Sequence, residues 1–132
     1  MMLQDLAGTY TGTVTWRDTR GGQGSLSETV VVESTSDGVA FQHDDGSGMY
    51  AEATALAENH VTLHGKSEEV GTTGTLYLAD HCMILDYVAH VRGREERNTD
   101  VWTFSGTSVA RAGVIRQADR TIWFEGGMER TG

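Results

Sequence analysis

The 132-residue chain has no proline, one cysteine and one lysine, and no apolar run long enough to span a membrane. Because proline cannot donate a hydrogen bond to a neighbouring strand, its absence leaves every segment free to join a β-sheet. Cys82 alone excludes an intrachain disulfide and an all-cysteine metal site. The chain also lacks a positively charged, apolar leader, so we expect a cytoplasmic protein.

Positive charge is scarce as well. Ten Lys and Arg residues stand against nineteen Asp and Glu residues, for a formal net charge of −9. A negative surface repels phosphate groups, so we expect neither nucleic acid nor an anionic membrane as a partner. Lys66 is outnumbered by the arginines, and Gly, Ala, Val, Thr and Asp are abundant. This bias is typical of a GC-rich bacterial coding sequence.

The chain is rich in short segments where apolar and polar residues alternate. In the first one, Tyr10, Val14 and Trp16 share one face and threonines occupy the other. Such alternation is typical of a strand with one face on a core and one in water. It recurs between glycine- and aspartate-rich turns, with no sustained helical period. The expected strands are 10–17, 26–32, 39–43, 49–58, 60–66, 72–79, 83–91, 102–104, 109–116 and 122–128.

The sequence leaves alternatives open for three segments: the inward face of two strands and the role of one charged stretch. In 49–58, alanines alternate with larger residues, and either set fits the inward face. In 109–116, Arg111 is in phase with Val109, although the alanines between them fit the inward face equally well. The charged stretch from Arg92 to Asp100 predicts a solvent-exposed loop, with a mobile lid over one barrel mouth as the alternative.

Eight to ten strands in so short a chain predict an all-β fold with a single domain over residues 1–132. An open sheet of this many short strands would expose its edges, whereas a closed sheet has none. We therefore expect one antiparallel, closed or nearly closed barrel. A two-sheet jelly roll is the alternative.

The two ends of the chain carry a family resemblance. Gly8-Thr9-Tyr10 opens the first strand, and Arg130 lies late in the last one. This resembles calycin-type barrels such as lipocalins, in which a glycine, any residue and an aromatic begin the first strand. The resemblance implies a closed, lipocalin-like barrel in which Arg130 packs across Tyr10. The helix pair of fatty-acid-binding proteins has no counterpart after Trp16.

Following the apolar faces inward also carries charged side chains into the barrel. A buried charge must be paired or lose its charge, so inward-facing acids and bases predict binding of a polar group or proton transfer. The alternative is that these side chains lie near strand ends and reach water. The candidate catalytic residues are Glu28, His43, Glu52 and Arg111.

Aromatic residues supply the remaining candidates. A small barrel is either just filled by side chains or holds one small ligand, and the many alanines and glycines in the strands favour unfilled space. For each single aromatic the alternative is a plain core position. The candidate ligand-binding residues are Tyr10, Trp16, Phe41, Tyr50, Tyr87, Trp102 and Phe124.

We expect no cofactor and no metal ion. His60 and His64 are four residues apart, but a strand separates such side chains by about 13 Å, too far to share one ion. Asp80, His81 and Cys82 are potential ligands on one turn, and adjacent residues seldom converge on an ion.

The sequence thus predicts a barrel that binds a small, largely apolar molecule in its lumen. The first alternative is a cofactor-free isomerase or cyclase acting on a polyketide-like natural-product intermediate, because templating and a few proton-transfer groups suffice for such chemistry. The second is an oligomeric structural or interaction module, with a homo-oligomer formed through a barrel face. Trp123 and Ile84 lie out of phase with their apolar neighbours and would point outward.

Overall fold

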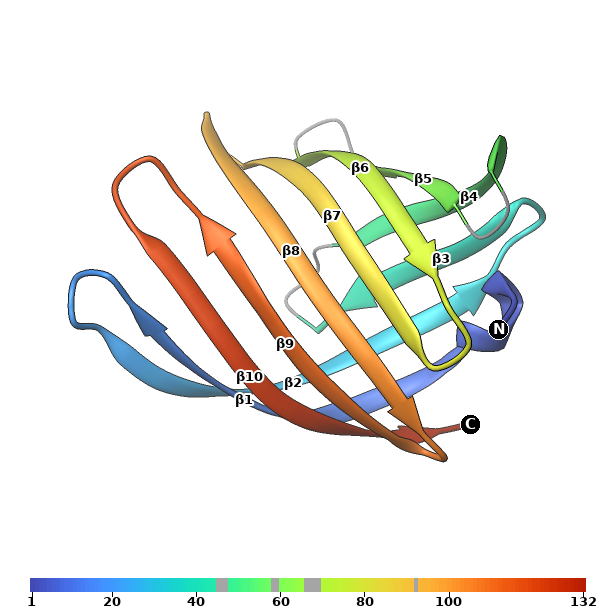
Figure 1. Cartoon of the computed structure of the whole chain (residues 1–132), viewed down its shortest axis with the longest axis horizontal. Coiled ribbons are helices and arrows are strands. Elements are labelled where there is room, and N and C mark those ends of the chain that lie inside the picture. The colour runs from blue at the N-terminus through green and yellow to red at the C-terminus, as the bar shows by residue number, and fades with distance from the viewer. Residues whose placement is uncertain (45–47, 58–59, 66–69, 92) are drawn as a thin grey trace.

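The computed structural model describes residues 1–44, 48–57, 60–65, 70–91 and 93–132, without the side chains of 53–57, 60, 61, 70 and 91. Over these residues, ten antiparallel strands form one closed barrel (Figure 1). The predicted strand residues 58 and 66, and Arg92 of the predicted loop, lie outside the described residues. The strands are β1 (Gly8–Asp18), β2 (Gln23–Ser34), β3 (Gly38–His43), β4 (Gly48–Ala57), β5 (His60–Gly65), β6 (Val70–Leu78), β7 (Cys82–Val91), β8 (Arg94–Ser105), β9 (Ser108–Arg116) and β10 (Thr121–Thr131).

The topology is a simple meander in which each strand pairs with the next along the chain. The barrel closes where β1 pairs with β10, with Tyr10 opposite Arg130 and Trp16 opposite Phe124. The all-β class and the closed antiparallel barrel are therefore confirmed. The architecture is consistent with a calycin-like fold.

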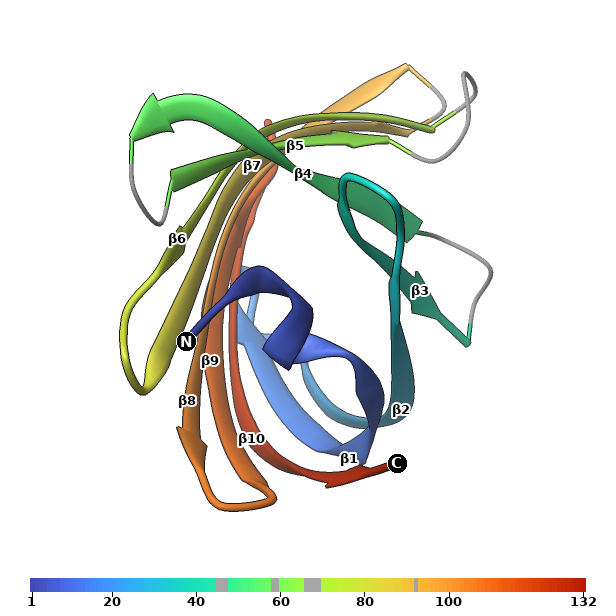
Figure 2. The same cartoon turned by 90° about the vertical axis from the view of Figure 1, so that its right-hand side faces the viewer.

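One end of the barrel is plugged. A 3-10 turn, η1 (Leu3–Leu6), lies across this opening (Figure 2), and its two leucines are buried. The Tyr10 hydroxyl donates a hydrogen bond to the Leu6 carbonyl oxygen at 2.6 Å. Beneath the turn, the Trp102 ring meets Tyr10 edge-on, with ring centres 5.1 Å apart, and Phe41 at 6.3 Å. Packing of buried aromatic edges against faces fills this half of the lumen.

Arg130 ties the last strand to this plug. Its guanidinium carbon lies 5.7 Å from the centre of the Tyr10 ring, and its Nη2 donates to the carbonyl oxygens of Asp5 and Ala7 at 2.7 and 2.6 Å. A Cβ at Gly8 would lie 2.9 Å from Arg130 Nε, so the glycine leaves room for the arginine. The contact implied by the calycin resemblance is confirmed.

The prediction of a charged loop is wrong: the described residues from Arg94 onward belong to β8, which pairs with β7 and β9 along its length. Its inward positions are polar where Glu96, Asn98 and Asp100 precede Trp102, so the segment lacks the apolar alternation by which strands were identified. Polar side chains are tolerated there because they face a cavity and one another.

Cross-strand pairing and burial show which residues of the segments 49–58 and 109–116 face the lumen. Met49 pairs with the buried Phe41, which puts Met49 and Ala51 on the inner face of β4 and Tyr50 on the outer face. On β9, Val109 and Arg111 are buried, whereas the alanines beside them are exposed.

We predict that Arg130→Ala destabilises the protein by about 1–3 kcal/mol, because it removes two hydrogen bonds to the plug and the cover of the Tyr10 ring. Urea denaturation measures the change. Arg20→Ala is the matched control, since the Arg20–Asp119 pair is 63% and 60% exposed and should contribute within about 0.5 kcal/mol. Equal effects of the two substitutions would contradict the assigned role of Arg130.

Candidate functional site

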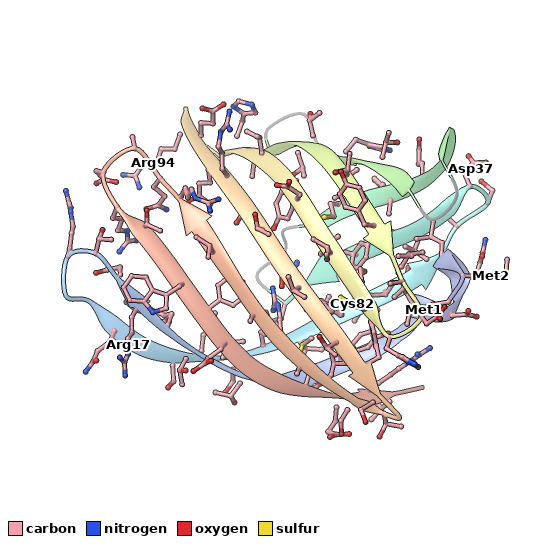
Figure 3. All side chains as sticks on the ribbon, in the orientation of Figure 1. Met1, Met2, Arg17, Asp37, Cys82 and Arg94 are labelled. Carbon is pink, nitrogen blue, oxygen red and sulfur yellow. The ribbon has the colours of Figure 1, made fainter. Side chains whose placement is uncertain are left out.

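The half of the lumen away from η1 holds a cavity of about 270 Å³. Its lining includes Trp16, which precedes Arg17 near the end of β1. The barrel end that carries Arg17 and Arg94 lies opposite the end at Met1 and Met2 (Figure 3). The side chains that line the cavity come from six strands, β1, β2 and β7 to β10, and one loop. They are Val14, Trp16, Leu26, Glu28, Tyr87, Asn98, Asp100, Arg111, Ile115, Arg120, Ile122 and Phe124.

Two aromatic rings form part of the cavity wall, and each lies against a glycine. A Cβ at Gly24 would lie 2.8 Å from Trp16 Nε1, and one at Gly113 would collide with the Phe124 ring. The glycines therefore let both rings lie close to the sheet instead of crossing the lumen. Together with the aliphatic side chains, they give the cavity largely apolar walls.

At the base of the cavity, one arginine is shared by two carboxylates. Arg111 donates from Nε to both Asp100 oxygens at 3.1 Å and from Nη2 to Asp100 Oδ2 at 2.7 Å. Its Nη1 forms an ion pair with Glu28 Oε1. Each of the three side chains is at most 10% exposed. Between Arg111 on β9 and Val14 on β1, the paired position on β10 is Gly126, which presents no side chain to the lumen.

A histidine completes the ion cluster, which we define as Glu28, His43, Asp100 and Arg111, and two aromatic rings pack against its arginine. His43 Nδ1 lies 3.8 Å from Glu28 Oε2. The Arg111 guanidinium lies 5.6 Å from the centre of the Trp102 ring and 5.2 Å from that of Phe124. Contact with ring faces stabilises a desolvated guanidinium.

The ion cluster holds fewer positive charges than carboxylates unless it binds a proton. Burial raises the pKa of Asp100 to about 7, against the opposing effects of the Trp102 indole N–H and of His43. Burial lowers the pKa of Arg111 to about 10, so the guanidinium stays charged at neutral pH. Asp100 is thus a group that can take up or release a proton near neutrality.

The cavity mouth is braced by a chain of polar side chains. Asp18 accepts hydrogen bonds from the backbone N–H groups of Arg20 and Gly22 and from Arg120 Nη1 at 2.9 Å. The backbone bond from Gly22 is the largest of the effects that lower the pKa of Asp18. This anchors the turn between β1 and β2.

The brace continues across the mouth to β8. Arg120 Nε donates to Gln117 Oε1 at 2.8 Å, and Gln117 Nε2 donates to Glu96 Oε1 at 2.6 Å. Tyr87 lies near this side, where burial and the charges of Asp100 and Glu96 raise the pKa of its hydroxyl. The Tyr87 hydroxyl therefore stays protonated at neutral pH and can donate a hydrogen bond.

The structure brings together three of the four candidate catalytic residues. Glu28, His43 and Arg111 all belong to the ion cluster. The expectation that Glu52 faces inward is wrong, because Glu52 is on the outer face, where its Oε1 lies 2.9 Å from His64 Nε2. That bond is the first cause of the raised pKa of His64. The inner face of β4 is formed by Met49 and Ala51, and Glu52 is in phase with Tyr50 on the other face.

The candidate aromatic residues divide into three groups. Trp16, Tyr87 and Phe124 line the cavity. Tyr50 packs on His64 outside the barrel, with ring centres 5.2 Å apart, so its predicted inward position is wrong. The remaining candidates belong to the filled core near η1 and are Tyr10, Phe41 and Trp102.

The sequence interpretation missed Asp100, Asn98 and Arg120. A signal for the first two was present, since stepping back from Trp102 by twos reaches both, on the same face of the strand. Arg120 lies in the turn after β9, where its hydrogen bond to Asp18 holds it in the cavity wall. The two residues are 102 positions apart in the sequence and meet only in the folded barrel. Local sequence carries no sign of that contact.

A scan against protein-family models finds no match to the chain, and a search of curated proteins finds none either. Among the described residues, no helix is long and apolar enough to cross a membrane. Within that same part of the chain, no group of three or more His, Cys, Asp or Glu side chains is placed to hold a metal ion. Trp123 and Ile84 point outward as predicted, at 45% and 37% exposure, and an oligomer through this face stays a prediction.

We predict that Arg111→Met destabilises the protein by about 3–5 kcal/mol near neutral pH, because it leaves two buried carboxylates without a cation. Denaturation at several pH values checks this, and the loss should shrink as acid protonates the carboxylates. Arg116→Met, on the outer face of the same strand, should change stability by no more than about 0.5 kcal/mol. A loss that does not depend on pH would argue against the shared ion pair.

A further prediction concerns Asp100 itself. Its pKa is about 7 in the folded protein against an ordinary 3.8, so this group favours folding most at low pH. Its contribution is lost as the pH rises from about 4 to about 7. Relative to Asp100→Asn, which cannot ionise, the wild type should lose unfolding free energy across this window. Parallel pH profiles of the two proteins in urea denaturation would show that the carboxyl titrates normally.

Proposed function

We propose that the protein binds a small, largely apolar molecule in the lumen of its barrel. The observation that carries this proposal is the cavity of about 270 Å³, with apolar walls and converging polar groups at its base. Concave, mostly apolar sites with few polar groups are the usual form of small-molecule sites. The filled core below the cavity and the plug at η1 leave the braced mouth as the entry.

The binding chemistry follows from the two ends of the cavity. Trp16, Phe124 and the aliphatic side chains would cover the apolar body of the ligand, and burying that surface would supply most of the affinity. Asn98 and the Tyr87 hydroxyl offer neutral polar contacts near the ion cluster. These groups would fix the orientation of the ligand rather than the strength of its binding.

A cofactor-free isomerase or cyclase is the second candidate function. It is favoured by one observation, the buried carboxyl of Asp100, whose pKa of about 7 suits a general acid or base at neutral pH. An apolar cavity beside such a group would template a reactive conformation and move a proton. A natural-product intermediate can be incubated with the protein and then recovered. Recovery of the compound unchanged would favour the binding protein, and recovery of an isomer of the added compound would favour the enzyme.

We predict that the neutral dye N-phenyl-1-naphthylamine binds in the lumen with increased fluorescence. Ile115→Trp, which points into the cavity, should weaken binding at least about tenfold by filling the site. Val114→Trp, one residue earlier on the outer face of the same strand, is the control and should leave affinity unchanged. If the first variant does not fold, Leu26→Trp replaces it, because Leu26 is 54% exposed at the rim and tolerates a larger side chain.

The outcome is read from dye titrations of proteins whose fold has been checked by circular dichroism. Absence of dye binding to the folded wild type would contradict the proposal. Equal affinity in the inward and outward variants would place the dye outside the lumen and contradict it as well.

A further inference from the structure

The base of the cavity carries a surplus of negative charge that no lining arginine neutralises. Glu28 and Asp100 share the single guanidinium of Arg111. Arg120, the other arginine of the lining, is held by Asp18 and Gln117 at the mouth. Both lining arginines are thus engaged by groups of the protein, and neither is free for an anionic ligand.

The groups that face Asp100 come from every strand packed around it. Arg111 bonds it from β9, and Glu28 lies beyond that guanidinium on β2, with His43 behind it on β3. Tyr87 faces it from β7. On its own strand, Asp100 lies between Glu96 at the mouth and the Trp102 indole. Arg111 is the permanent cation of this set, and the two carboxylates of Glu28 and Asp100 share it.

We propose that the lumen selects apolar molecules that carry a protonated amine, and that the ammonium lies against the carboxylates of Glu28 and Asp100. This inference rests on the proposed function and names its ligand class. An ammonium has three N–H donors and no acceptor, and the carboxylate oxygens at the cavity base are the acceptors it needs. The Trp16 and Phe124 ring faces would add cation–π attraction.

The same arrangement rejects carboxylates of equal size. An anionic ligand would be desolvated beside two like charges while both arginines remain engaged, and such burial is strongly unfavourable. The affinity of a neutral alcohol should lie between those of the amine and the carboxylate. It forms no ion pair with the carboxylates, but it is not repelled by them and costs little to remove from water. Amine, alcohol and carboxylate should therefore bind in that order.

Binding of the amine should be coupled to a proton. The ammonium and the proton on Asp100 compensate the same negative charge, so each disfavours the other. Below pH 7 the ligand must expel the proton, and its affinity should fall by up to about tenfold per pH unit. Above pH 7 the affinity levels off until the amine itself deprotonates, near pH 10 for an alkylamine.

The test uses 2-phenylethylamine, 2-phenylethanol and 3-phenylpropanoate as competitors of bound N-phenyl-1-naphthylamine between pH 5.5 and 8.5. We expect the amine to bind at least about tenfold more tightly than the alcohol at pH 8, with the carboxylate weakest. Only the amine should gain affinity as the pH rises toward 7.

Variants locate the effect. Asp100→Asn should weaken the amine at least about tenfold and flatten its pH dependence, while the alcohol changes by less than about twofold. Glu52→Gln removes a carboxylate from the outer face of the barrel and should alter neither ligand. If Asp100→Asn does not fold, Glu28→Gln should show the same selective loss of the amine.

The possible results separate the two proposals. If the dye and the alcohol bind but the amine binds no better than the alcohol, the ligand class is wrong and lumen binding stands. A carboxylate that binds best, or an amine whose pH dependence survives Asp100→Asn, also overturns the ligand class. If neither the dye nor the alcohol binds the folded protein, both proposals fail.

Discussion

The ion pair that joins Arg111 to Asp100 and Glu28 is the interaction on which the interior of this barrel depends. Charges removed from water cost several kcal/mol each unless they are paired and hydrogen-bonded. Here β9 supplies the cation, and β8 and β2 supply the carboxylates, so the cluster also links strands across the lumen. The geometry needs the closed sheet, because β2 and β8 are not neighbours in the strand order and their inward side chains meet only across the lumen.

The cluster divides the lumen into two parts of different character. Toward η1, Tyr10, Phe41 and Trp102 fill the space and are at most 1% exposed. Toward the mouth, the rings of Trp16 and Phe124 lie back against glycines and a cavity remains. The filled part supplies much of the buried apolar surface, which allows the other part to stay hollow at a tolerable cost in stability.

Much of the fold could be predicted from alternation alone, because a two-residue period with turn signals is a local property. The closing contact of Arg130 with Tyr10 could be anticipated from the chain ends. The phase of β4 could not, since alanine fits either face and only pairing with Phe41 decides it.

The site was predicted in part for a similar reason. Glu28 and Arg111 lie in phase with apolar neighbours and could be found that way. Apolar alternation alone does not reveal Asp100, because its strand begins with polar residues on both faces. Its two-residue spacing from Trp102 is the one local signal for it. Which charges meet across the lumen depends on the register of β1 with β10, where the two ends of the chain come together. No local pattern encodes that register.

A titrating carboxyl at the base of the cavity should contact whatever the lumen binds. Carboxyl ¹³C chemical shifts of Asp100 and Glu52, followed by NMR over pH 3–9 with and without 2-phenylethylamine, test this most directly. We expect free Asp100 to titrate near pH 7 and the amine to move its midpoint to lower pH. Addition of the amine should leave the chemical shift of outward-facing Glu52 unchanged. An Asp100 midpoint near 4 that the amine leaves unchanged would contradict this expectation.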